Sequence, residues 1–393
     1  MIKDYLQRFF DTKISIFFLS LLGLITILIS RYVYSYDIEL SKQDASSYIL
    51  MAKDLSNYFY INQQEAMRIL PSFTSYLLVN LFSIDHFLSF RIITYSFFII
   101  LLNQIFFFYK KFKVQNYLAF SSVLILVFWN NSIIYNIFNP YQAVDLFLYI
   151  VVIYLMQFSI FFDRKKLLLF SFLGIFTKEF LIVLILISYF KNIFIDKKKL
   201  YFDLLFLIII FFINYTFAGY LNKDTKISSH ILTDISLYKT YLNQAYICLI
   251  FEKKILFFLP FIILIFNRKF ITFIQEYKLY FLYILVPVFV SIFLYSLVGN
   301  NFFRVYYQGF FVFIIFALIF LSKNIETQKF LPVLYFFLPS TFAIDFIFIL
   351  FNINQLSFSD YYNFVRYEYL SGYFIFSLLF IFIFFKLRSK TYE

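Results

Sequence analysis

Long apolar runs, separated by short polar or basic gaps, make up most of this 393-residue chain. The first run, residues 14–30, is long enough to cross a bilayer as a helix, and it lacks a small-residue cleavage site. Basic residues collect on the cytoplasmic side of membrane proteins, so the pattern predicts a cytoplasmic N-terminus and an outer location for the polar stretch 36–71. The basic residues before the first run are Lys3, Arg8 and Lys13.

Further apolar runs of helical length follow, and basic residues stand in alternate gaps between them. The longer, more acidic gaps then fall on the outer side, and both termini fall inside. The sequence therefore predicts an all-α, polytopic bundle of about 11 to 12 membrane segments, with interfacial helices in the first outer loop. No internal repeat or soluble domain is visible, so we interpret residues 1–393 as a single integral membrane domain. The further spans are predicted at about 87–109, 117–135, 143–162, 200–218, 245–266, 279–298, 304–321, 330–350 and 372–387.

The run 167–190 departs from this alternation, because basic residues flank both of its ends. A single crossing would leave positive charge on the outer side, whereas two half-length helices that meet near 174–179 return the chain to its starting side. The sequence there is GIFTKE, and its Lys178 and Glu179 are costly at membrane depth unless they pair or line a wet cavity. We therefore predict a broken helix that reverses at this point.

Composition supports the membrane class and excludes several other classes. Hydrophobic residues make up 63% of the chain and its mean hydropathy is +0.82, both far above what a soluble core requires. The net charge of +12 comes largely from residues that orient helices, so nucleic-acid binding is not expected. The single cysteine, Cys248, and the two histidines, His86 and His230, cannot form an intrachain disulfide or a Cys/His metal site.

Asp44 stands out among the acidic residues of the first outer stretch. Asp44, Tyr48 and Ala52 are four positions apart, so Asp44 lies at the start of a helix if the chain is helical from Ala45 onward. A carboxylate at that position can cap the helix, or it can act as an acid or base when apolar walls tune its pKa. Residues 68–83 follow as a moderately apolar segment that predicts a helix lying at the outer interface.

The order of several motifs resembles the GT-C superfamily of polytopic glycosyltransferases. Within it, the chain is most similar to the bacterial lipid A aminoarabinose transferases and to relatives of protein O-mannosyltransferases. The resemblance covers a module of about 1–220, and the additional helices of about 245–390 share it only at one arginine. The segments that carry it are Asp44-x-x-x-Tyr48-x-x-x-Ala52, Arg68-x-x-Pro71, Asn139-Pro140 with Asp145, GIFTKEF, and NNFFRVYYQGFF with Arg304.

The resemblance implies transfer of a sugar, with inversion, from a polyprenyl-phosphate donor to a hydroxyl of a glycan, lipid or protein. The reaction would take place at the outer face of the bacterial inner membrane. Asp44 would be the general base, and Lys178 and Arg304 would bind the lipid phosphate and stabilise it as a leaving group. No cofactor is implied, and the use of a divalent metal stays open because the loop departs from the family's acidic pair. Supporting residues would be Arg68, Asp145, Glu179 and Tyr48.

Simpler roles and two other function classes stay open on the sequence alone. Asp44 and Asp145 could be helix caps, Lys178 and Glu179 could neutralise each other, and Arg304 could anchor its helix at the headgroups. A transporter or flippase of lipid-linked saccharides would also be helical with buried charges, although such folds often show paired repeats. A polymerase of lipid-linked saccharides would be expected to carry more arginine in its outer loops.

Overall fold

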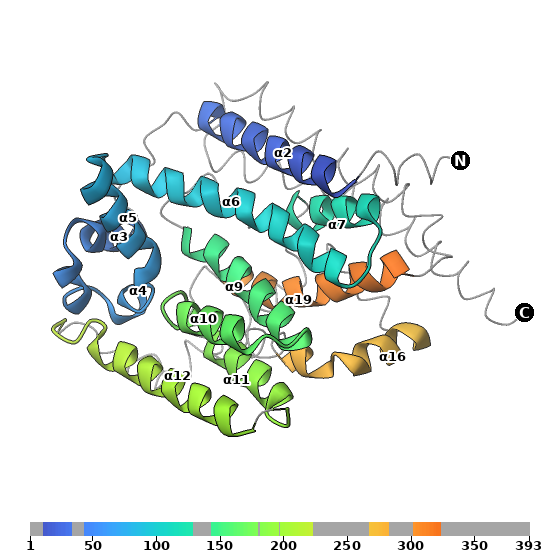
Figure 1. Ribbon diagram of the computed structural model, residues 1–393. Helices are drawn as coiled ribbons and strands as arrows, with labels where there is room; N and C mark the ends of the chain where they lie inside the picture. The colour runs from blue at the N-terminus through green and yellow to red at the C-terminus, as the bar shows by residue number, and fades with distance from the viewer. Residues whose placement is uncertain are drawn as a thin grey trace, which may run out of the picture. The chain divides into compact units, whose positions relative to one another are not determined.

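A computed structural model of the chain describes residues 11–33, 43–128, 143–179, 181–195, 197–222, 267–282 and 302–323 (Figure 1). Every regular element in these residues is a helix, which confirms the all-α prediction for this part of the chain. The chain divides into two compact units. The first unit comprises Ile16–Phe108 and Ser132–Leu232, and the second comprises Met1–Ser15, Tyr109–Asn131 and Thr233–Glu393.

The described helices agree with the predicted spans where the two can be compared. Within the described residues, three helices are long and apolar enough to cross a membrane: α6 (His86–Lys111), α9 (Ala143–Ile160) and α12 (Lys197–Phe217). The spans predicted at 245–266, 330–350 and 372–387, and all of the span at 279–298 except 279–282, lie outside the described residues. The count of about 11 to 12 segments therefore stays a prediction. The second unit contains α7 (Asn116–Phe128), α16 (Arg268–Glu276) and α19 (Phe302–Lys323). The other elements are α2 (Thr12–Val33), α3 (Gln43–Lys53), η1 (Leu55–Phe59), α4 (Gln63–Ala66), α5 (Ile69–Phe82), α6 (His86–Lys111), α9 (Ala143–Ile160), α10 (Arg164–Ile175), α11 (Leu181–Asn192) and α12 (Lys197–Phe217).

The polarity of α12 is partly inverted relative to a helix of a water-soluble protein, although its buried face also includes Leu200, Leu204 and Leu207. Its outward side chains include Phe202 and Phe212, which are 67% and 59% exposed. Its polar Asp203 and Asn214 are buried against the neighbouring helices. In water, each Å² of such exposed apolar surface would cost about 25 cal/mol, so this face is typical of a helix that contacts lipid or another apolar partner.

The helix α5 has the same inverted polarity. Pro71, Ser72 and Ser75 are its buried residues, whereas Leu81 and Phe82 are exposed. Its 14 residues give a length of about 21 Å, which is shorter than the roughly 30 Å hydrocarbon core of a bilayer. The helix predicted within residues 68–83 is therefore present, and its place at a membrane interface stays a prediction.

A break divides the run 167–190 into α10 and α11, as the sequence predicts. The helix α10 ends at Ile175, and the chain turns through residues 176–179 before α11 begins at Leu181. The backbone N–H groups of Thr177 and Lys178 both donate to the Gly174 carbonyl, which closes the end of α10. Each helix has 12 residues, or about 18 Å, so neither is long enough to cross a bilayer alone.

Contacts with α9 establish that the chain reverses direction at this break. The turn contacts the first residues of α9 through Lys178 and Asp145. The last residue of α11, Asn192, donates to the carbonyl and hydroxyl oxygens of Ser159 near the end of α9. Since α10 follows α9 directly, α10 runs antiparallel to α9 and α11 returns parallel to it. We call α10, α11 and their turn the hairpin.

Aromatic packing joins α16 to α19 in the second unit. Phe270 on α16 contacts Phe313 and Phe320 on α19, with ring centroids 5.9 and 5.1 Å apart. Tyr277, which follows α16, stacks on Phe316 at 4.8 Å. This unit carries Arg304 near the start of α19.

Candidate functional site

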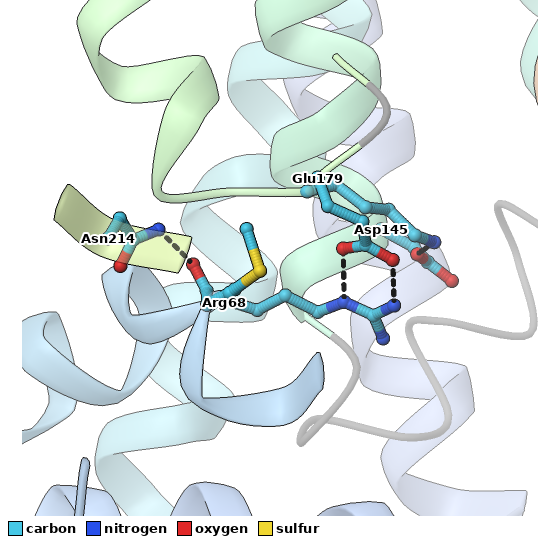
Figure 2. Close-up of polar contacts among 6 residues, drawn as sticks. Arg68, Asp145, Glu179 and Asn214 are labelled. Carbon is cyan, nitrogen blue, oxygen red and sulfur yellow. Dashed lines mark hydrogen bonds and ion pairs between the residues drawn. The ribbon is translucent and has the colours of Figure 1, made fainter. Parts of the chain in front are cut away.

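A bidentate ion pair joins the residue before α5 to the turn of the hairpin (Figure 2). Arg68 Nε donates to Glu179 Oε2 at 3.1 Å, and Arg68 Nη2 donates to Glu179 Oε1 at 2.7 Å. The planar guanidinium matches the carboxylate edge to edge, so the pair fixes the orientation of both side chains as well as their separation.

A second ion pair joins the same turn to α9. Lys178 Nζ donates to Asp145 Oδ1 at 2.7 Å, and the two side chains are only 6% and 4% exposed. The Glu179 side chain is 31% exposed, so the pair with Arg68 is the more accessible of the two. Asp145 lies in the first turn of α9, where the positive end of the helix dipole also favours its negative charge.

These contacts bring together four side chains that the sequence singles out separately. We call Arg68, Asp145, Lys178 and Glu179 the charge cluster. Its two positive and two negative charges balance. Lys178 and Glu179 are not simply paired with each other, because each forms its ion pair with a residue from a different element, although the Lys178 charge also acts on Glu179.

Two positive charges act on the Glu179 carboxylate. Arg68 forms the bidentate ion pair with it, and the charge of Lys178 also acts on it. Both charges favour the ionised form of Glu179, which orients the Arg68 guanidinium.

The helix α3 places a tyrosine beside the charge cluster. Tyr48 is 3% exposed, and its side chain interacts with the Arg68 guanidinium. Asp44 is in the first turn of α3, four residues before Tyr48, so the two positions lie on one face of the helix. The side chain of Asp44 is outside the described part of the structure, and its role as a base stays a prediction.

Arg304 belongs to the second unit, where it is the third residue of α19. Its side chain is likewise outside the described part of the structure. The proximity of Arg304 to Lys178, which a shared phosphate site requires, therefore stays a prediction.

A compact apolar core borders the charge cluster. Two of its members, Met67 and Val144, directly precede Arg68 and Asp145 in the sequence. Apolar walls lower the local dielectric constant, so charge interactions beside them are stronger than in bulk water. The buried members of this core are Tyr48, Met51, Ala52, Ile61, Ala66, Met67, Phe90, Val144 and Ala218.

Asn214 on α12 is a buried polar residue of this site that the sequence analysis did not single out. Its Nδ2 donates to the carbonyl oxygens of Met67 at 3.3 Å and Ile175 at 3.4 Å. Its Oδ1 accepts a hydrogen bond from the Tyr58 hydroxyl at 2.7 Å. An amide inside an apolar run signals a special position, because a polar group there needs a partner. That signal, applied to the predicted span 200–218, would have found Asn214.

The cationic donors of the charge cluster are each paired with a carboxylate. Arg68 and Lys178 supply cationic donors, and their carboxylate partners hold them in place. Among the described residues, no group of three or more His, Cys, Asp or Glu side chains could hold a metal ion. Comparisons of the chain with protein-family models, with curated protein sequences and with solved structures find no match.

Proposed function

We propose that the chain is a membrane glycosyltransferase that moves a sugar from a polyprenyl-phosphate donor to a hydroxyl acceptor. The observation that supports this proposal is the charge cluster, in which residues from the start of α5, from α9 and from the hairpin turn meet beside α3. Among these residues, the GT-C resemblance implies that Lys178 binds the donor phosphate and that Arg68, Asp145 and Glu179 support the site. The inverted polarity of α5 and α12 supports a lipid environment for such a donor.

In the proposed reaction, the acceptor oxygen attacks the anomeric carbon of the sugar as the bond from that carbon to the phosphate oxygen breaks. The attack inverts the anomeric centre. The acceptor hydroxyl gives its proton to the carboxylate of Asp44, and the released polyprenyl phosphate keeps the electron pair of the broken bond. Lys178 and Arg304 donate hydrogen bonds to that phosphate and stabilise its growing negative charge.

Charge balance supports a part for Arg304 in this scheme. The charge cluster is neutral as a whole. An anionic phosphate that enters it must therefore either compete with Asp145 for Lys178 or bind together with a further cation. A third cation removes the need to break the buried pair. Arg304 supplies that cation in the proposal.

The test uses the full chain in proteoliposomes with a panel of polyprenyl-phosphate sugars, and it measures release of free polyprenyl phosphate. Wild type should consume at least one donor, and Asp44→Asn should reduce turnover by about 10²- to 10⁴-fold. Asn caps a helix about as well as Asp, so the substitution should leave protein abundance unchanged. The matched control is Asp54→Asn, because Asp54 caps η1 through the Ser56 N–H and has no part in the proposed reaction.

The proposal fails if wild type releases polyprenyl phosphate from no donor, or if Asp44→Asn turns over like Asp54→Asn. Movement of the intact donor between leaflets without bond cleavage would instead identify a flippase. A fluorescent donor analogue distinguishes the two activities, because bleaching reports its leaflet and chromatography reports its cleavage.

A further inference from the structure

We propose that Asn214 is a positioning residue that sets the geometry of the charge cluster by joining the two backbone segments that carry it. The proposal builds on the proposed function, because it assigns Asn214 to the same site. Asn214 itself contacts backbone carbonyls and Tyr58. It affects the ion pairs indirectly, through the backbone segments that carry Arg68 and Glu179.

The hydrogen bonds of Asn214 bridge the segment of Arg68 and the segment of Glu179. One acceptor, the Met67 carbonyl, directly precedes Arg68, and the other, the Ile175 carbonyl, ends α10 four residues before Glu179. A single amide nitrogen holds both carbonyls, so their separation is fixed within a few ångströms. Beside this bridge, the backbone N–H of Leu70 donates to the Phe176 carbonyl at 3.3 Å. The two segments are therefore attached to each other on both sides of Arg68.

Tyr58 fixes the orientation of the Asn214 amide. Its hydroxyl donates to Asn214 Oδ1 at 2.7 Å and contacts the Asn214 carbonyl oxygen at 3.0 Å. With Oδ1 directed at this donor, Nδ2 is directed at the two carbonyls, and the reverse orientation would place two oxygens against carbonyl oxygens. The backbone also holds Tyr58 in place, because the N–H of Gly219 donates to its carbonyl at 3.0 Å.

A second asparagine provides a matched control within the same helical bundle. Asn192 and Asn214 are both 3% exposed, and the Nδ2 atom of each donates to carbonyl oxygens of neighbouring elements. Asn192 joins α11 to Ser159 at the end of the hairpin remote from the charge cluster. If burial of an amide were all that mattered, the two asparagines would behave alike.

The experiment measures thermal unfolding midpoints of the full chain in nanodiscs for single and double variants. Asn214→Leu and Asn192→Leu each replace the amide with an apolar side chain of similar size, and each is combined with Glu179→Gln. Because Asn214 acts through the Arg68–Glu179 pair, the midpoint loss in Asn214→Leu with Glu179→Gln should be smaller than the sum of the single losses. The losses of Asn192→Leu and Glu179→Gln should add. Additive losses in both double variants would overturn the proposal.

Tyr58→Phe provides a milder variant where Asn214→Leu yields no folded protein, because it removes only the hydroxyl that orients the amide. Its midpoint loss should also overlap with that of Glu179→Gln, and simple addition would again overturn the proposal.

The kcat of sugar transfer gives a second readout. A role in stability alone would leave the kcat of the folded protein unchanged. At saturating donor, Asn214→Leu should lower kcat by about 10- to 100-fold with little change in KM, while Asn192→Leu keeps the wild-type kcat. Equal kcat values in the two variants would count against positioning. Absence of transfer in wild type would refute the proposed function, and the unfolding comparison would still decide the role of Asn214.

Discussion

Removal of Lys178 alone should destabilise the protein far more than removal of Lys178 together with Asp145. The two charges are 2.7 Å apart and almost fully buried. At an effective dielectric constant of about 20, that separation gives an attraction of roughly 6 kcal/mol, which is offset by a desolvation cost of several kcal/mol for each ion. The pair as a whole therefore contributes little net stability. Lys178→Met leaves the Asp145 carboxylate buried without its counter-ion, which should cost about 3 to 5 kcal/mol.

Two further variants set the scale for this loss. Glu179→Gln removes the negative charge from an ion pair of the same 2.7 Å length, but the Gln amide oxygen can still accept a hydrogen bond from the Arg68 guanidinium, so the cost should be about 1 to 3 kcal/mol. Lys166→Met breaks a surface pair with Asp163, in which Lys166 is 59% exposed, and should cost at most about 1 kcal/mol. The expected order of destabilisation is thus Lys178→Met, then Glu179→Gln, then Lys166→Met.

Equilibrium unfolding by SDS titration in mixed micelles measures these differences as changes in the free energy of unfolding. The double variant Lys178→Met with Asp145→Leu should recover most of the stability that Lys178→Met loses, because no unpaired charge is left in the core. Two results would refute the reasoning: a Lys178→Met cost no larger than that of Lys166→Met, or a double variant as unstable as the sum of its single variants.

Three other predictions concern topology, donor binding and backbone strain. Accessibility tags at Lys165 and Lys198 should both report the cytoplasm, and labels on opposite sides would contradict a hairpin that returns to its starting side. Arg304→Ala should weaken donor binding by about 1.5 to 3 kcal/mol through loss of a charge-assisted hydrogen bond, and an unchanged donor Kd would leave Arg304 as a helix anchor. Gly219 has a φ of +64°, and a Cβ atom there would lie 2.7 Å from the Ile61 carbonyl oxygen. Gly219→Ala should therefore reduce the free energy of unfolding by more than about 1 kcal/mol, and an unchanged value would refute the strain.

The break between α10 and α11 could be predicted because it follows from charge, which the sequence displays directly. Basic residues on both sides of 167–190 are incompatible with one crossing, and the Lys178–Glu179 dipeptide marks the costliest point of the run. The sequence singled out Lys178 and Glu179 as costly charges within an apolar run, and the GT-C resemblance singled out Arg68 and Asp145. Their actual partners could not be predicted. Arg68 and Glu179 are 111 positions apart, and only the tertiary packing of α5 and α9 around the hairpin determines which carboxylate each cation meets.

Asn214 was missed for a different physical reason. The acceptors of its amide are backbone carbonyls, which every residue has, so no particular side chain elsewhere in the sequence reveals the contact. Asp203 in the same helix pairs with Arg164, and it too was treated as part of an apolar span. A search for a partner of each polar residue in α12 would have singled out both Asp203 and Asn214.

Directional contacts fix the turn of the hairpin, and this accounts for how a short segment can hold charges in a defined place. The contact of Asn192 with Ser159 fixes the remote end of the hairpin and not the turn. At the turn, Lys178 contacts Asp145 and the Ile175 carbonyl contacts Asn214. A turn held only by apolar packing could shift by an ångström at little cost, whereas directional hydrogen bonds and ion pairs resist such a shift. Electrostatic stabilisation of a developing charge depends on dipoles and ions that are already in position, so rigidity of this turn is the property that a phosphate-binding role requires of Lys178.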